Sequence, residues 1–355
     1  MYITIYYSNM FDKNIVKNYL FPMALILIAN SFSKEIKQYF KPSEDISDYE
    51  LVRKYLLNDF PLYGKKRPII WIHSEYEVNS RKWNSFQSRN TTEINQPYLI
   101  ECVQSVINMC GNDFNICLID DDSFDKLIPN WNVDMNSFSD PLKKQYRLLG
   151  LLKLIYIYGG IHLPNSFLCT SNLTGLFQSH LDSEQMFACE NVNNSVDMMQ
   201  FKNQPRFMPT ADIIGSIKEN PVMLAVIKEI ESIFENGHYT SQFDFKGCVS
   251  SILYKHMQND SISVIDGRYI GVKDDKNKPI TIDDLMQEEH LQITDAYGIY
   301  IPKHELLKRI KYQWFAVATQ EQIYETTNVL TKYFAISSYN NADNKQKLTP
   351  LVTSI

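Results

Sequence analysis

The sequence of 355 residues predicts an α/β fold, with a mixed, mostly parallel sheet flanked by helices in a single main domain. Short apolar runs at residues 69–72 and 114–119 are typical of strands buried on both faces. A helical pattern between them gives a strand–helix–strand order, which makes neighbouring strands parallel. The 44% hydrophobic content supplies one large core, and the composition excludes disordered, collagen-like, coiled-coil and disulfide-scaffold proteins.

The remaining elements follow from periodicity and from glycine and proline positions. Pro97 begins a helix that ends at Gly111, and a second helix over residues 142–158 ends at Gly159-Gly160. Asp266-Gly267 predicts a type I′ hairpin turn. The other expected elements are strands at 161–163, 186–189, 262–265 and 268–270, helices at 221–234 and within 301–338, and a polar tail at 340–347.

We expect an N-terminal apolar segment and helical extension over residues 1–66, the main domain over 67–300, and C-terminal helices with a polar tail over 301–355. Residues 18–33 carry no charge, but Pro22 and Asn30 interrupt a run that is shorter than the ~20 residues of a spanning helix. Three interpretations stay open, namely a short membrane anchor, an interfacial helix, or a helix packed on the domain.

Net charge and cysteine content limit the kinds of partner and the compartment that we expect for this chain. The net charge of −6 and pI of about 5.7 argue against a general nucleic-acid coat, so no nucleic-acid partner is expected. The six cysteines form no C-x-x-C pair and no zinc-site spacing. They are typical of reduced thiols in a reducing compartment.

Ligands of open α/β sheets bind at the carboxyl ends of the strands. Four polar groups follow predicted strands there: His73-Ser74, Asp120–Asp122, Pro164–Ser166 and Glu190-Asn191. The motifs G-x-G-x-x-G, G-x-x-x-x-G-K-[ST], G-x-S-x-G and H-E-x-x-H are all absent from the sequence. Dinucleotide, P-loop, hydrolase-elbow and zinc-protease sites are therefore unsupported.

The acidic run Asp120–Asp122 has two interpretations. Adjacent side chains point in different directions, so three consecutive aspartates seldom chelate one ion. We favour a helix N-cap, where carboxylates accept bonds from free backbone N–H groups. His73 and His162, at predicted strand ends, are more typical of hydrogen-bonded structural residues than of catalytic bases.

The stretch Tyr156–Ile161 (Tyr-Ile-Tyr-Gly-Gly-Ile) resembles the sugar-binding-region glycosyltransferases and the capsular polysaccharide synthesis proteins. Those families carry a helix ending in Tyr-Lys-Tyr-Gly-Gly, then a strand and an Asp-x-Asp motif. Residues 69–71, 96–107, 116–122 and 213–221 resemble other family segments in the same order. The resemblance covers residues 68–235 and implies a GT-A-like (Rossmann-like) fold.

A second resemblance points to a source. Residues 79–89, 95–98 and 117–129 are similar to a group of proteins from large DNA viruses of eukaryotes, and the similarity extends to residues 312–316. It implies a viral origin and a location in the virion or in the virus factory of the host cytoplasm. Membrane association would then use residues 18–33.

The chain departs from the families at both of their polar motifs. Asp-x-Asp carboxylates hold Mn²⁺ or Mg²⁺, which clamps the diphosphate of a UDP-sugar. Pro164, Asn165 and Ser166 occupy these positions here, which makes the motif degenerate and leaves no metal site. Leu148 and Leu151 replace an Asp-x-x-Arg pair, with Arg147 one helical turn before Leu151.

The favoured function is therefore a pseudoenzyme, a virion or membrane-associated structural or glycan-binding protein. The alternative is an active, hexosyltransferase-like nucleotide-sugar enzyme with a metal-independent site, or with Mn²⁺ or Mg²⁺ and a UDP-sugar. Expected partners are a glycan or nucleotide sugar, a membrane, or other virion proteins. The catalytic candidates are Asp120, Asp121, Asp122 and Glu190. The nucleotide-sugar-binding candidates are Trp71, His73, Arg147, Gly159, Gly160, His162, Asn165 and Ser166.

Overall fold

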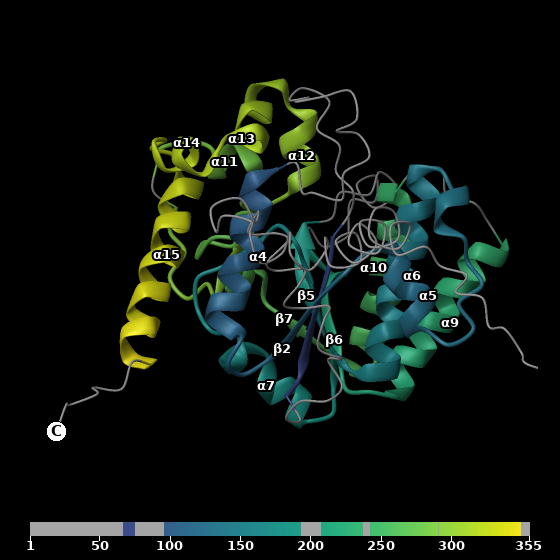
Figure 1. Cartoon of the computed structure of the whole chain (residues 1–355). Helices are drawn as coiled ribbons and strands as arrows, with labels where there is room; N and C mark the ends of the chain where they lie inside the picture. Colours follow the sequence, from purple (N-terminus) through teal and green to yellow (C-terminus); the bar gives the residue numbers. More distant parts are fainter. Residues whose placement is uncertain (1–66, 75–95, 193–206, 237–241, 290, 349–355) are drawn as a thin grey trace, which may run out of the picture. The chain divides into compact units, whose positions relative to one another are not determined.

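The computed structural model describes residues 67–74, 96–192, 207–236, 242–289 and 291–348 (Figure 1). These residues belong to one unit, Asp48–Ile355. The predicted N-terminal extension over 1–66, with its apolar run at 18–33, lies outside them, as does the stretch 79–89. Within the described ranges no helix combines the length and apolar character needed to cross a membrane. The expected domain boundaries stay predictions.

A six-stranded sheet in the order β2-β1-β3-β6-β5-β7 forms the centre of the unit. β1 is parallel to β2 and β3, and β5 is parallel to β7, whereas β6 is antiparallel to both β3 and β5. Five strands therefore share one direction, which confirms the predicted mixed, mostly parallel sheet flanked by helices. The strands are β1 Ile69–His73, β2 Asn115–Ile119, β3 Gly160–Pro164, β5 Met186–Val192, β6 Phe207–Ser216 and β7 Ile262–Ile265.

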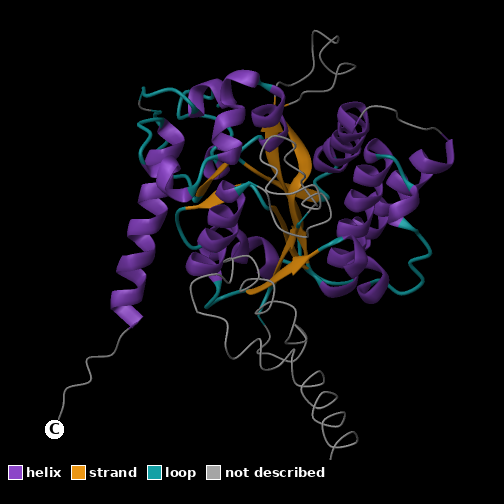
Figure 2. Cartoon of the chain, turned by 45° about the horizontal axis from the view of Figure 1, so that its top comes forward, coloured by secondary structure: helices purple, strands orange, loops and turns teal. Residues whose placement is uncertain are grey.

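Helices cover both faces of this sheet (Figures 1 and 2). Successive side chains of a strand point to opposite faces, so Ile70 and Ile72 join the core with α4, while Ile69 and Trp71 join the core with α6. This explains why β1 is apolar at every position. The helices on one face include α4 Pro97–Cys110 and α15 Val329–Leu348, and those on the other include α6 Asp140–Tyr158, α9 Pro221–Asn236 and α10 Gln242–Gln258.

The Gly159-Gly160 pair lets β3 pass close beside β1. The φ angles of Gly159 and Gly160 are 75° and 108°, a region that favours glycine. A Cβ atom on Gly160 would lie 2.4 Å from the Ile69 carbonyl oxygen. The indole Nε1 of Trp71 donates to the Gly159 carbonyl oxygen at 2.9 Å, which ties the end of α6 to β1.

The predicted N-cap at Asp120 is confirmed. α5 spans Asp121–Leu127, and Asp120 Oδ1 accepts from the Ser123 backbone N–H at 3.1 Å. The Ser123 side chain in turn accepts from the Asp120 backbone N–H, which completes a capping box. The run of aspartates therefore begins a helix.

The predicted hairpin at Asp266-Gly267 is wrong. A type I′ turn needs positive φ at both central residues, but Asp266 has a φ of −58°. Its side chain instead accepts from the Arg268 backbone N–H at 2.8 Å and caps a 3₁₀ helix, Gly267–Ile270. The aspartate before this glycine therefore caps a helix, because its carboxylate accepts a hydrogen bond from the backbone N–H of Arg268.

Several other expectations at the C-terminal end are also corrected. The predicted polar tail at 340–347 is wrong, because α15 continues to Leu348. The expected helical region 301–338 is divided into α12 Lys303–Lys308, α13 Gln313–Val317, α14 Gln320–Tyr324 and α15. The periodicity missed three strands, namely β6 and the pair β4 Phe167–Cys169 and β8 Gly298–Tyr300. It also missed the helices α7 Thr174–Asp182, α10 and α11 Ile282–Leu285.

Gly160→Ala is expected to lower the free energy of unfolding by ~2–4 kcal/mol, because the new Cβ meets the Ile69 carbonyl and φ is unfavourable. Urea titration measures this loss. Gly267→Ala is the matched control, since its nearest neighbour would be 3.4 Å away, and it should change stability by less than ~1 kcal/mol. Equal effects of the two substitutions would contradict the close-approach explanation.

Candidate functional site: a basic pocket at the carboxyl edge of the sheet

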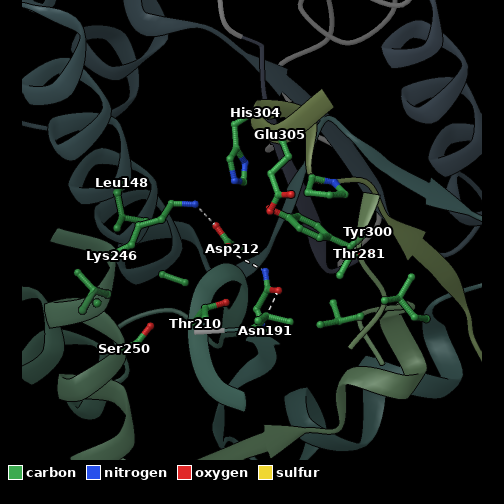
Figure 3. A pocket seen from close by; sticks show the side chains of 17 residues that line it. Leu148, Asn191, Thr210, Asp212, Lys246, Ser250, Thr281, Tyr300, His304 and Glu305 are labelled. Carbon is green, nitrogen blue, oxygen red and sulfur yellow. Dashed lines mark hydrogen bonds and ion pairs between the residues drawn. The ribbon is translucent and has the colours of Figure 1, made fainter. Parts of the chain in front are cut away.

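Two adjoining cavities open where β1 and β3 end. We call the first, of about 280 Å³, the basic pocket; its lining includes His73, Arg147, His162, Asn165 and Ser166. The second, of about 130 Å³, is called the Tyr300 pocket and is drawn in Figure 3. The two share six lining residues: Leu148, Ala211, Asp212, Lys246, Tyr300 and His304.

The antiparallel strand β6 brings an acidic residue to this edge. His162 of β3 pairs with Ile214 of β6, so Asp212, two residues earlier on β6, lies beyond His162 towards the carboxyl end of β3. A residue in the middle of β6 therefore lies beside residues at the carboxyl ends of the parallel strands. The topology, and not sequence proximity, joins Asp212 to Pro164–Ser166 in one pocket lining.

The basic pocket carries an excess of positive charge. Its lining contains one carboxylate, Asp212, and five cationic side chains. These cations come from α6, α10 and α12, and they are Lys144, Arg147, Lys246, Lys303 and Lys308. Such a lining attracts an anion, and lysine and arginine are the side chains with which proteins bind phosphate groups.

Asp212 is held from two sides (Figure 3). Its Oδ1 accepts from Lys246 Nζ at 2.5 Å, and its Oδ2 accepts from Asn191 Nδ2 at 3.0 Å. Burial raises the pKa of Asp212, but the Lys246 ammonium and the Asn191 amide outweigh burial and keep the pKa below its usual range. Asp212 is therefore an ionised, hydrogen-bonded carboxylate at the junction of the two cavities.

A buried charge pair supports the wall of the basic pocket. Arg147 binds Asp121 in a bidentate manner, with Nε–Oδ1 and Nη2–Oδ2 distances of 2.7 Å each. His73 Nε2 lies 3.1 Å from Asp121 Oδ1, and its ring stacks on Phe124. Burial raises the pKa of Asp121, but hydrogen bonds from Arg147 and His73 hold it well below its usual range.

Two buried polar side chains of the basic pocket have atoms without a hydrogen-bond partner among the described residues. They are Nδ1 of His162, which is 8% exposed, and Nδ2 of Asn165, which is 2% exposed. Burial, with smaller contributions from His73 and Lys246, lowers the pKa of His162 to about 3 despite the nearby Asp212 carboxylate. Buried polar atoms are nearly always paired, so these two atoms indicate where a ligand would bond.

The structure brings some of the sequence candidates together and separates others. His73, Arg147, His162, Asn165 and Ser166 all line the basic pocket. Trp71, Gly159 and Gly160 lie outside both linings and join β1 to the α6–β3 connection.

The four acidic candidates also lie outside both cavity linings. Asp120 caps α5, Asp121 binds Arg147, and Asp122 is exposed in the first turn of α5. Glu190 accepts from Lys273 Nζ at 2.6 Å and from the Gly267 backbone N–H at 3.1 Å. Asp120, Asp121 and Glu190 therefore have structural contacts, and none of the three lines either cavity.

The sequence reasoning missed Asp212, Lys246, Tyr300 and His304. Among these four, the sequence offered a signal only for Asp212, which is the single acidic residue in the largely apolar stretch 207–216. Lys246 lies on a helix that the periodicity did not predict, and Tyr300 lies on a three-residue strand. Only the tertiary contacts join these elements.

Asn165 and Ser166, the polar residues that follow β3, do not fit a divalent cation. Asn165 Oδ1 already accepts from Lys303 Nζ at 3.0 Å, and an ammonium group there repels a metal ion. Ser166 Oγ donates to the Ile301 carbonyl oxygen at 2.8 Å. Within the described ranges, no three His, Cys, Asp or Glu side chains are grouped so that they could hold a metal.

No family model matches the chain, and no curated protein matches it. Solved structures that are similar to this chain include the apo form of glycosyltransferase GlyE from Streptococcus pneumoniae TIGR4, at 12% identity over 82% of this chain, with a TM-score of 0.40. Galactosyltransferase LgtC with donor and acceptor sugar analogs is 10% identical over 77% of this chain and 95% of its own, with a TM-score of 0.38. The bifunctional glycosyltransferase WbbM is 12% identical over 80% of this chain, with a TM-score of 0.41. This chain spans 66% of GlyE and 50% of WbbM.

Arg147→Met is expected to lower the free energy of unfolding by ~3–5 kcal/mol, because it removes the bidentate cationic partner of the buried Asp121 and leaves only the contact with His73. The double variant Asp121→Leu/Arg147→Met should recover most of the loss. Lys153→Met, which breaks a half-exposed pair with Glu231, is the matched control and should cost less than ~1 kcal/mol. Chemical denaturation compares the four proteins, and a double variant as unstable as the single one would count against the pair.

His162→Asn is expected to make stability less sensitive to acid. His162 is neutral when folded, with a pKa of about 3, and accepts a proton on unfolding below its ordinary pKa of 6.5. The unfolded chain binds more protons in that window, so the free energy of unfolding falls as pH drops from 6.5 towards 3. The decline should be shallower in the variant, as measured by urea titrations across that range.

His304 also lowers the free energy of unfolding at acid pH, since burial, aided by Lys246, lowers its pKa to about 4. Adding His304→Gln to His162→Asn should therefore flatten the profile further between pH 6.5 and 4. Identical slopes in the wild-type protein and in both variants would show that neither imidazole is held neutral by burial.

Proposed function

We propose that this chain is a glycosyltransferase-fold protein that binds the diphosphate of a nucleotide sugar in the basic pocket, through lysine and arginine side chains. The observation that carries the proposal is the lining of five cations and one carboxylate at the carboxyl edge of the sheet. The resemblance of Tyr156–Ile161 to the sugar-binding-region glycosyltransferases supplies the class of ligand.

Lys303 takes the place that a metal ion has in the resembling families. There, a divalent cation on the Asp-x-Asp carboxylates neutralises the diphosphate. Here Asn165 stands at such a position, and its side chain accepts from the ammonium group of Lys303. A fixed ammonium supplies positive charge at that site without a carboxylate ligand.

Binding without efficient transfer is the favoured form of this function. The pocket carboxylate, Asp212, has a lowered pKa, and a carboxyl group with a lowered pKa is a poor general base near neutral pH. Both of its oxygens already accept hydrogen bonds. Leu148 and Leu151, at the positions of the families' Asp-x-x-Arg pair, present apolar surface to the pocket.

Metal-independent glycosyl transfer is the second candidate. The same cations favour it, because positive groups fixed around a departing diphosphate stabilise the charge that develops on it. The two candidates differ in turnover, so release of nucleoside diphosphate from a nucleotide sugar separates them.

A viral origin and a place in the virion or virus factory belong to the same proposal. Their support is the resemblance of residues 79–89 and 117–129 to proteins of large DNA viruses. Residues 18–33 are the proposed tether to a membrane. Mass spectrometry of purified particles tests this location, and absence of the chain from particles would contradict it.

Calorimetric titration of the full chain with UDP, UDP-glucose, UDP-galactose and GDP-mannose tests the pocket. Binding is expected in EDTA, with no gain from Mn²⁺. Lys303→Met should weaken it roughly tenfold or more, the loss of one charge-assisted bond. Lys332→Met is the matched control, because that lysine also donates to an amide oxygen, the Glu288 carbonyl, but lies on α15 outside the pocket.

The proposal fails if none of the four compounds binds, or if binding requires Mn²⁺ and is unchanged in Lys303→Met. Nucleotide release at a steady rate would select the transferase over the binding protein. Saturable binding with no release would select the binding protein.

A further inference from the structure

An exposed apolar cluster lies on the segment that also forms part of the basic pocket. Leu307, Ile310 and Trp314 are 38%, 79% and 45% exposed, and we call them the α12–α13 patch. They belong to α12, to the 3₁₀ helix Ile310–Tyr312 and to α13, three short elements that contact one another at the top of Figure 1. Three large apolar side chains exposed within eight residues indicate a surface that another apolar phase covers.

The fold holds this segment in place through other side chains. Leu306, Tyr312 and Phe315 are buried in the core that α4 shares. The Tyr312 hydroxyl donates to Asp283 Oδ1 at 2.6 Å. The outward position of Leu307, Ile310 and Trp314 is therefore set by an anchored backbone, and not by a loose loop.

Basic side chains belong to the same segment as the patch. Lys308, Arg309 and Lys311 are exposed on it, in a chain whose net charge is −6, whereas Lys303 binds Asn165 in the basic pocket. Two carboxylates offset them in part, since Arg309 pairs with Asp283 and with Glu305, and Lys311 lies 3.7 Å from Asp283. Three exposed cations against two carboxylates leave this segment with an excess of one positive charge.

We propose that the α12–α13 patch is the contact surface for an anionic lipid bilayer. Isoleucine and leucine enter the acyl boundary, and tryptophan prefers the headgroup region. The surrounding lysines and arginine bind anionic headgroups. The charge complementarity selects a lipid surface, since an apolar protein partner does not need a cationic rim.

Membrane contact through this patch would also orient the basic pocket relative to the bilayer. α12 supplies Lys303 and Lys308 to the lining of that pocket. The contact would therefore place the pocket beside the bilayer surface. The proposal depends on residues 303–314, does not require nucleotide-sugar binding, and is separate from the tether proposed at residues 18–33.

Vesicle flotation of the full chain tests it, with phosphatidylcholine vesicles and with vesicles that contain roughly a quarter phosphatidylserine. Wild-type protein should float with the anionic vesicles only. Ile310→Ser/Trp314→Ser should lower the partition coefficient roughly tenfold or more, because both side chains leave water on binding. Lys311→Glu should lower it roughly fivefold or more, and added salt should mimic that effect.

Tyr339→Ser is the matched control, because Tyr339 is exposed on α15 and lies outside the patch. The substituted side chains are exposed, so thermal unfolding should be unchanged in every variant and confirms folding. Unchanged flotation of Ile310→Ser/Trp314→Ser would overturn the proposal, because binding would then come from another part of the chain. Self-association that this variant abolishes, measured by light scattering without lipid, would also overturn it in favour of a second copy.

Discussion

The close approach of β3 to β1 is the contact on which the rest of the site depends. Gly160 lies where a Cβ would meet the Ile69 carbonyl, and Trp71 donates to the carbonyl of Gly159. With β3 held there, Pro164 pairs with His73 at the carboxyl edge of the sheet. The antiparallel β6 then adds Asp212, and both cavities form around that meeting point.

Polar and charged side chains of the basic pocket are bound by other residues of the chain. The amide oxygen of Asn165 accepts from the ammonium group of Lys303. In the same way, the positive charge of Arg147 is balanced by the carboxylate of Asp121, which lies outside the pocket lining. An anion entering the pocket meets fixed ammonium groups and two unpartnered side-chain nitrogens, on His162 and Asn165.

Pattern reasoning succeeded where local chemistry and burial agree. The continuous apolar runs gave β1 and β2, and the proline and glycine boundaries gave α4 and α6. It failed at Asp266-Gly267, where two local structures compete for the same residues and the aspartate capped a 3₁₀ helix. It also failed for the tail at 340–347, because a polar composition does not prevent a helix from continuing.

The α/β class, the parallel strand pair and the sharp turn at Gly159-Gly160 were contained in the sequence, since hydrophobic periodicity and glycine conformation act over short stretches. The absence of carboxylates from Pro164–Ser166 was equally evident from the sequence. The composition of the pocket was not, because Asp212, Lys246 and Lys303 are far apart in the chain and belong to β6, α10 and α12. Side chains from distant elements become neighbours only through strand order and helix packing, and these depend on contacts summed over the whole core.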